Sequence, residues 1–133
     1  MARLVTLHDT DGEIIYPQTV SDMDYSTSEQ DTGCKWIDGK PIYKKTVDYG
    51  ALPNNTIKYV NHGIANMARA VKIEGIIQMS STNWTKIPLV YKGVDSTYNA
   101  EFQVTTTYVH CATNQDRSSL SAIITIWYTK TTD

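Results

Sequence analysis

Hydrophobic and polar residues alternate with a period of two along most of the chain from residue 34 onward. Within 42–49, odd-numbered residues such as Tyr43 share one face, and the even-numbered residues share the other. Within 120–129, Ile124 and Ile126 face opposite to their odd-numbered neighbours. Because successive side chains of a β-strand point to opposite faces, this alternation predicts strands with one face buried.

Further strands follow from the same pattern and from polar turns at a spacing of roughly ten residues. The expected strands span 35–37, 42–49, 56–60, 71–79, 84–91, 100–110 and 120–129. Only Ile64 to Ala70 favours a helix, and that segment is one or two turns long. Parallel strands need crossover connections, usually helices, so the chain predicts an all-β, antiparallel β-sandwich of a jelly-roll-like kind.

Three local features modify this strand pattern. Gly75 precedes two consecutive isoleucines, which predicts a bulge or bend beside it. Pro88 lacks a backbone donor, so its strand is expected to be at a sheet edge or kinked. Asn61-His62-Gly63 predicts a turn in which the His62 ring bonds to neighbouring backbone; a ligand or metal role for this ring is the alternative.

Residues 1–33 differ in pattern and are expected to form an attachment arm that precedes a head domain over 34–133. Two short strands, 3–8 and 13–16, flank an Asp-Gly turn. The stretch over 21–33 is polar and acidic, which predicts an extended linker or loop. Two short strands are not stable alone, so the arm needs a partner: the head, a second copy or another protein.

Composition supports the strand pattern and limits the classes of partner. The chain has 133 residues, enough for one domain, and contains 18 Thr, 9 Tyr and only 1 Phe. Thr and Tyr favour pleated, half-buried surfaces. The formal net charge is −2, with 12 basic and 14 acidic side chains, so we expect no nucleic-acid partner. No run approaches the roughly 20 apolar residues of a membrane helix, and acidic residues near the start argue against a signal peptide.

Catalytic, metal and cofactor chemistry finds little support in the sequence. Cys34 and Cys111 form no CxxC pair and accompany no local histidine cluster, so we interpret them as reduced, structural thiols. Pairing of a cysteine with His62 or His110 for catalysis is formally open but lacks a nucleophile signature. No glycine-rich nucleotide loop is present, and the paired acidic residues lie in polar turns. We therefore expect no enzyme activity, no metal and no cofactor.

Aromatic residues that carry polar atoms are the strongest candidates for a binding surface. Tyr and Trp suit surfaces that are partly apolar and partly wet, such as saccharide sites and subunit interfaces. Most of these rings are expected in the core or in an oligomer interface. Trp84, beside a Ser-Ser-Thr-Asn run, and Tyr98, in a polar turn, are the best candidates for exposed contacts.

Several segments, taken in order along the chain, resemble bacteriophage and prophage tail-fibre and baseplate-associated proteins. The opening, Leu4–Asp9 followed by Ile15–Pro17, is similar to the start of small phage tail proteins. The later segments are Trp36–Thr46, Leu52–Thr56 with His62–Ile64, and Ile126–Asp133. The resemblance implies a C-terminal β-sandwich head, commonly a homotrimer, that contacts the host surface, often a saccharide. It also implies an N-terminal stretch that attaches to the rest of the tail.

From this resemblance we expect a non-enzymatic tail-fibre tip or receptor-binding head, made in the bacterial host cytoplasm and located in the virion. Its partners would be further copies in a homotrimer, other tail proteins through the arm, and a host-surface glycan. Amide groups pair with sugar hydroxyls while a flat ring covers a sugar face. Loops at one end of the sandwich would therefore present the ligand-binding residues Trp84, Tyr98, Asn99 and Asn114.

Three alternatives to this function stay open. The first is a purely structural protein of tail or baseplate assembly, which would bind only other tail proteins. The second is a free-standing carbohydrate-binding module, which a monomer in solution would favour. The third is a glycan-cleaving enzyme, which needs paired carboxylates in a groove. Against it, the acids of the head are scattered: Asp38, Asp48, Glu74, Asp95, Glu101, Asp116 and Asp133.

Overall fold

The computed structural model describes residues 7–8, 14–15, 24–89 and 99–133, and within these residues every regular element is a strand. The first two strands are β1 (Leu7–His8) and β2 (Ile14–Ile15). The others are β3 (Gln30–Lys35), β4 (Pro41–Ala51), β5 (Ile57–Asn61), β6 (Met67–Ser80), β7 (Asn83–Lys86), β8 (Ala100–Val104), β9 (Tyr108–Thr113) and β10 (Ser121–Lys130). In the described ranges no helix has the length and apolar character to cross a bilayer.

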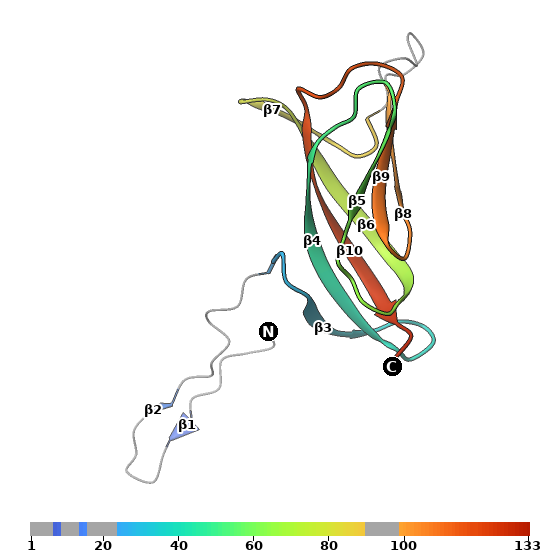
Figure 1. The fold of residues 1–133 in the computed structure, drawn as a ribbon. Coiled ribbons are helices and arrows are strands. Elements are labelled where there is room, and N and C mark those ends of the chain that lie inside the picture. The colour runs from blue at the N-terminus through green and yellow to red at the C-terminus, as the bar shows by residue number, and fades with distance from the viewer. Residues whose placement is uncertain (1–6, 9–13, 16–23, 90–98) are drawn as a thin grey trace.

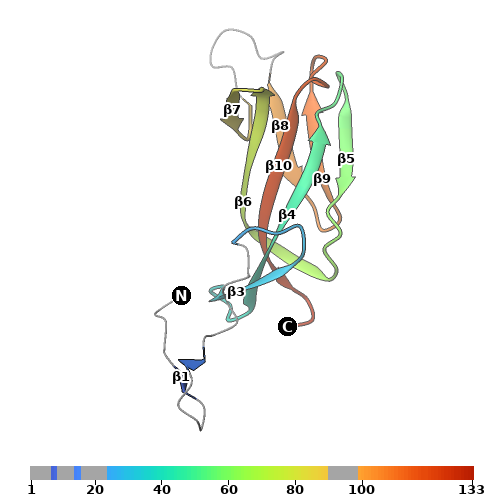
Figure 2. The same cartoon turned by 90° about the vertical axis from the view of Figure 1, so that its left-hand side faces the viewer.

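Two antiparallel layers form the head (Figure 1; Figure 2). One layer has the strand order β3-β4-β10-β6-β7, and the other has the order β5-β9-β8. The chain changes layer four times, between β4 and β5, between β5 and β6, between β7 and β8, and between β9 and β10, as in a jelly roll. β10 then lies between β4 and β6 and pairs with both. The prediction of an all-β, antiparallel β-sandwich is confirmed.

The N-terminal segment contains both an expected and an unexpected pairing. β1 and β2 pair antiparallel, with Leu7 opposite Ile15, which confirms the short hairpin expected there. β3 lies largely within the stretch expected to be a linker, yet it pairs with β4 and places Gln30 opposite Lys44. Hydrogen bonds of the backbone, rather than burial of apolar side chains, hold this polar edge strand. The sheet therefore begins before residue 34.

The core lies between the two layers and follows the alternation along the long strands. On β10, Ala122, Ile124, Ile126 and Tyr128 are at most 1% exposed, and all four face the three-stranded layer. On β4, Val47 and Tyr49 are buried, as the pattern over 42–49 predicted. The Tyr43 ring stacks on the Tyr128 ring, with 6.0 Å between centroids. These two strands supply the centre of the sandwich.

The single strand expected over 100–110 is wrong: the chain turns there and forms the β8–β9 hairpin. The backbone N–H of Thr105 donates to the carbonyl of Tyr108 at 2.8 Å. The Thr105 hydroxyl accepts from the backbone N–H groups of Thr107 and Tyr108, at 3.2 and 2.9 Å. Three consecutive threonines favour a strand, but a threonine hydroxyl can also close a turn, and here that local bonding prevails.

Two further local predictions are wrong. Residues 67–70 begin β6 rather than form a helix, because Asn66 adopts a left-handed conformation with φ of 57° that stops helical bonding. The register of β6 against β10 passes Gly75 without a shift and changes instead between Lys72 and Ala70. A Cβ at Gly75 would lie 2.9 Å from the Ile123 carbonyl oxygen, so the glycine serves close packing rather than a bulge. The strand before Pro88 does lie at an edge, as β7, and the Ile87–Pro88 peptide is cis.

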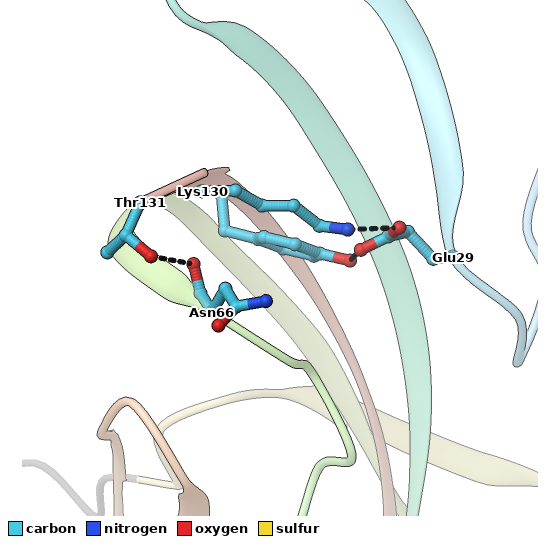
Figure 3. Close-up of polar contacts among 5 residues, drawn as sticks. Glu29, Asn66, Lys130 and Thr131 are labelled. Carbon is cyan, nitrogen blue, oxygen red and sulfur yellow. Dashed lines mark hydrogen bonds and ion pairs between the residues drawn. The ribbon is translucent and has the colours of Figure 1, made fainter. Parts of the chain in front are cut away.

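A polar cluster joins the segment before β3 to the end of β10 (Figure 3). The Tyr128 hydroxyl donates to Glu29 Oε1 at 2.5 Å, and Lys130 Nζ lies 2.6 Å from Glu29 Oε2. Burial of the carboxyl raises the pKa of Glu29, but the hydrogen bonds from Lys130 and Tyr128 outweigh it and hold that pKa below its usual value. This Glu29 cluster bonds residues that are about a hundred positions apart in the sequence.

Candidate functional site

β7, the start of β8 and the end of β9 lie toward the same end of the sandwich (Figure 1), and the three predicted site residues that the structure describes lie on or next to these strands, in both layers. Trp84 lies on the edge strand β7, is 55% exposed and pairs with Gln78. Ala100 pairs with Thr113, so half-buried Asn99 and exposed Asn114 flank one rung of the β8–β9 hairpin. Tyr98 lies outside the described residues. The roles of all four residues in binding stay predictions.

A second surface, which the sequence pattern did not reveal, lies on the outer face of the three-stranded layer. It consists of the rings of Tyr59 on β5 and of Tyr108 and His110 on β9, here called the tyrosine platform. Tyr59 lies directly opposite His110 in the register, with 5.1 Å between the ring centroids. The Tyr59 and Tyr108 rings meet edge to face, with 5.6 Å between centroids and an angle of 73°. Tyr59 is 57% exposed and Tyr108 is 41% exposed.

Polar side chains border the tyrosine platform on the same face. Gln103 on β8 is opposite His110 in the register, and its Nε2 donates to Glu101 Oε1 at 3.3 Å. Asn61 is opposite Tyr108, and its Oδ1 accepts from the Gly63 backbone N–H at 2.7 Å. Rings thus offer an apolar surface, while amides, a carboxylate and phenol hydroxyls offer hydrogen bonds around it.

A third surface is a groove on the outer face of the five-stranded layer, with a volume of about 570 Å³. Paired residues Ile76 and Ile123 form its apolar centre, and both are about half exposed. The hydroxyls of Thr46 and Thr125 bond to each other at 2.9 Å on the same face. We call it the isoleucine groove; its lining is Tyr25, Thr46, Ile73, Glu74, Gly75, Ile76, Lys86, Ile87, Ile123 and Thr125.

His62 is buried, and its ring bonds to the backbone of its own turn, as the sequence predicted, and also to the facing β8–β9 turn. Its Nδ1 accepts from the backbone N–H of Ile64 at 3.1 Å. Nε2 therefore carries the proton and donates to the Thr105 carbonyl at 2.9 Å, which ties β5 to the β8–β9 turn. Burial lowers the pKa of His62 below its usual value of 6.5, the Thr105 carbonyl opposes that shift, and the charge on Lys45 adds to it.

We expect the free energy of unfolding to fall as pH drops below about 6.5, through His62. In that range the unfolded chain binds a proton that folded His62 resists, so acid favours unfolding. Denaturant titrations at several pH values should show this loss in the wild type and a flatter profile in His62→Gln. An unchanged slope in His62→Gln would contradict the assignment.

The two cysteines lie in different environments of the described part of the chain. Cys34 is exposed, whereas Cys111 is buried on β9, and both are free thiols. Burial raises the pKa of Cys111 to about 12, although Lys58 opposes it, so this sulfur stays a thiol at neutral pH. Among the described residues no group of three or more His, Cys, Asp and Glu side chains could hold a metal ion.

Comparisons with known proteins identified no relative of this chain. No protein-family model, no curated protein and no solved structure matches this chain. Arguments about its function therefore start from the three surfaces described above.

Proposed function

We propose that this protein is a non-enzymatic binding module that contacts a cell-surface saccharide through the tyrosine platform. The observation that carries the proposal is the edge-to-face pair of Tyr59 and Tyr108, both held half exposed on a rigid sheet. Folding alone does not favour exposed aromatic rings, since a buried aromatic ring contributes far more to the stability of the fold than an exposed one. Exposed rings on a sheet therefore favour a ligand with a flat, partly apolar face.

The chemistry around the rings suits a sugar better than a purely apolar ligand. Pyranose rings present C–H groups on one face and hydroxyls at the edge. Gln103, Glu101 and the tyrosine hydroxyls supply donors and acceptors beside the rings. Both strands of the platform pair within one sheet, so little conformational entropy is lost when a ligand binds.

The biological setting that we propose is a phage tail, and it rests on the sequence resemblance. In this setting the module is the tip or receptor-binding head of a tail fibre in the virion. Residues 1–33 attach it to other tail proteins, and copies assemble as a homotrimer. The saccharide is then part of the bacterial host surface.

Removing one ring of the platform should weaken binding of the full-length protein to immobilised bacterial surface polysaccharide by about tenfold or more. Glycan arrays and cell-wall pull-downs would compare the wild type with Tyr59→Ala and Tyr108→Ala. Tyr25→Ala is the matched control, since Tyr25 is about equally exposed but lines the isoleucine groove, on the outer face of the other layer. Loss of binding in Trp84→Ala with retention in Tyr59→Ala would instead place the saccharide site at the end of the sandwich. Absence of binding to every glycan and cell-wall preparation would refute the proposal.

A purely structural role in tail assembly is the second candidate, and the isoleucine groove favours it. A half-exposed, isoleucine-rich face is typical of protein interfaces rather than of sugar sites. Adsorption to host cells separates the two functions, because only a saccharide-binding head adsorbs in the absence of the other tail proteins.

A further inference from the structure

The most exposed large apolar side chain of the described residues lies at the tip of the β3–β4 hairpin. Ile37 is 89% exposed. Its turn closes without it: the Gly39 N–H donates to the Trp36 carbonyl at 2.9 Å, and Asp38 Oδ1 accepts from the Lys40 N–H at 3.0 Å. Branched apolar residues are unusual in such turns, where polar residues and proline are preferred. Nothing in the hairpin packs on this side chain, so it is free to contact a partner.

The isoleucine groove has the complementary character. It is open, apolar at its centre and large enough for a turn of two or three residues rather than one side chain. Exposed Lys86 lies on its rim, and Glu74 lies there too, paired with Lys72 at 3.1 Å. The hairpin tip carries the matching charges in exposed Asp38, directly after Ile37, and exposed Lys35, two positions before it.

We propose that the Ile37 tip of one copy docks in the isoleucine groove of a second copy of this chain. Ile37 then packs on Ile76 and Ile123, Asp38 meets Lys86, and Lys35 approaches Glu74. The proposal is independent of the saccharide site, because the groove and the tyrosine platform lie on opposite layers.

This contact is heterologous, since tip and groove are different surfaces of the same chain. Each copy therefore has one tip and one groove to offer, and repeated contacts give a ring or an open chain. A hairpin tip buries less than the 1,200–2,000 Å² or so of a standard stable interface, so the pairwise affinity is expected to be weak. A ring closed by three such contacts would be the proposed homotrimer, and it should dissociate into monomers as the protein is diluted.

Sedimentation velocity of the full-length protein over a wide range of concentrations tests the contact. The wild type is expected to self-associate, and Ile37→Asp should weaken association by about tenfold or more. The double variant Ile76→Thr/Ile123→Thr, which suits a strand, should do the same. An equimolar mixture of the two variants should associate again but stop at a 1:1 pair, because only one intact tip and one intact groove remain.

Charge-exchange variants and a control isoleucine variant test the same contact further. Asp38→Lys and Lys86→Glu should each weaken association, and their combination in one chain should restore it. Ile57→Thr, a half-exposed isoleucine on the other layer, should have no effect. A wild type that stays monomeric at every concentration, association that Ile37→Asp leaves unchanged, or a mixture that fails to associate would each overturn the proposal.

Discussion

Replacing Ile124 by alanine should lower the free energy of unfolding by about 2–5 kcal/mol. The side chain is fully buried at the middle of β10, between Val47 on β4 and Gly75 on β6. Truncation removes the burial of this apolar side chain and leaves a cavity. The two paired strands, one on either side of β10, prevent this cavity from collapsing. Urea titration followed by tryptophan fluorescence would measure the change, at a protein concentration low enough to exclude self-association.

The adjacent residue provides the control. Ile123 is 48% exposed on the opposite face of the same strand, so Ile123→Ala should cost less than about 1 kcal/mol. Both substitutions delete the same atoms and change strand propensity equally. Equal losses for the two variants would mean that β10 is not buried on one face as described.

Replacing Glu29 by alanine should cost about 2 kcal/mol. The substitution leaves the hydroxyl of fully buried Tyr128 and the mostly buried ammonium of Lys130 without their carboxylate partner. Hydrogen bonds to charged groups contribute more than neutral ones, and an unpaired buried donor is costly. Urea titration at neutral pH would measure the loss.

The dependence of stability on acid pH should also reveal the contacts of Glu29. Because the folded-state pKa of Glu29 lies below 4.5, its stabilising effect is complete above that value and is lost as pH falls through the folded-state pKa. Glu29→Ala should therefore have a shallower acid dependence than the wild type. In the control Glu74→Ala, whose ion pair with Lys72 is half exposed, the loss should stay below about 1 kcal/mol. Similar losses in both variants would contradict the special role of the Glu29 cluster.

Period-two alternation predicted which faces of β4 and β10 are buried, although it missed the turn between β8 and β9. Along β10 and β4 each inward side chain packs against the opposite layer, so the alternation of residues along these strands indicates which side chains are buried. Threonine and tyrosine content indicated the all-β class before any strand was assigned. His62 was also predictable, because its bonds lie within its own turn and the facing turn.

Other features depend on pairings between distant segments, and alternation carries no information about those. Polar Glu29 gives no sign that it meets Tyr128, and β3 gives no apolar pattern because backbone bonds hold it. The tyrosine platform forms only when the register brings Tyr59 opposite His110. A search for tyrosines on the polar face of an edge strand could have identified Tyr59 as exposed, but not its partners.

The position of β10 in the middle of its sheet affects how the protein folds during its synthesis. β4 and β6 lie on either side of β10 and are joined only through it. While a ribosome is still making residues 81–120, both strands exist without the neighbour that completes them, and their apolar sides are open to aggregation. The five-stranded layer can close only after residues 121–130 have left the exit tunnel.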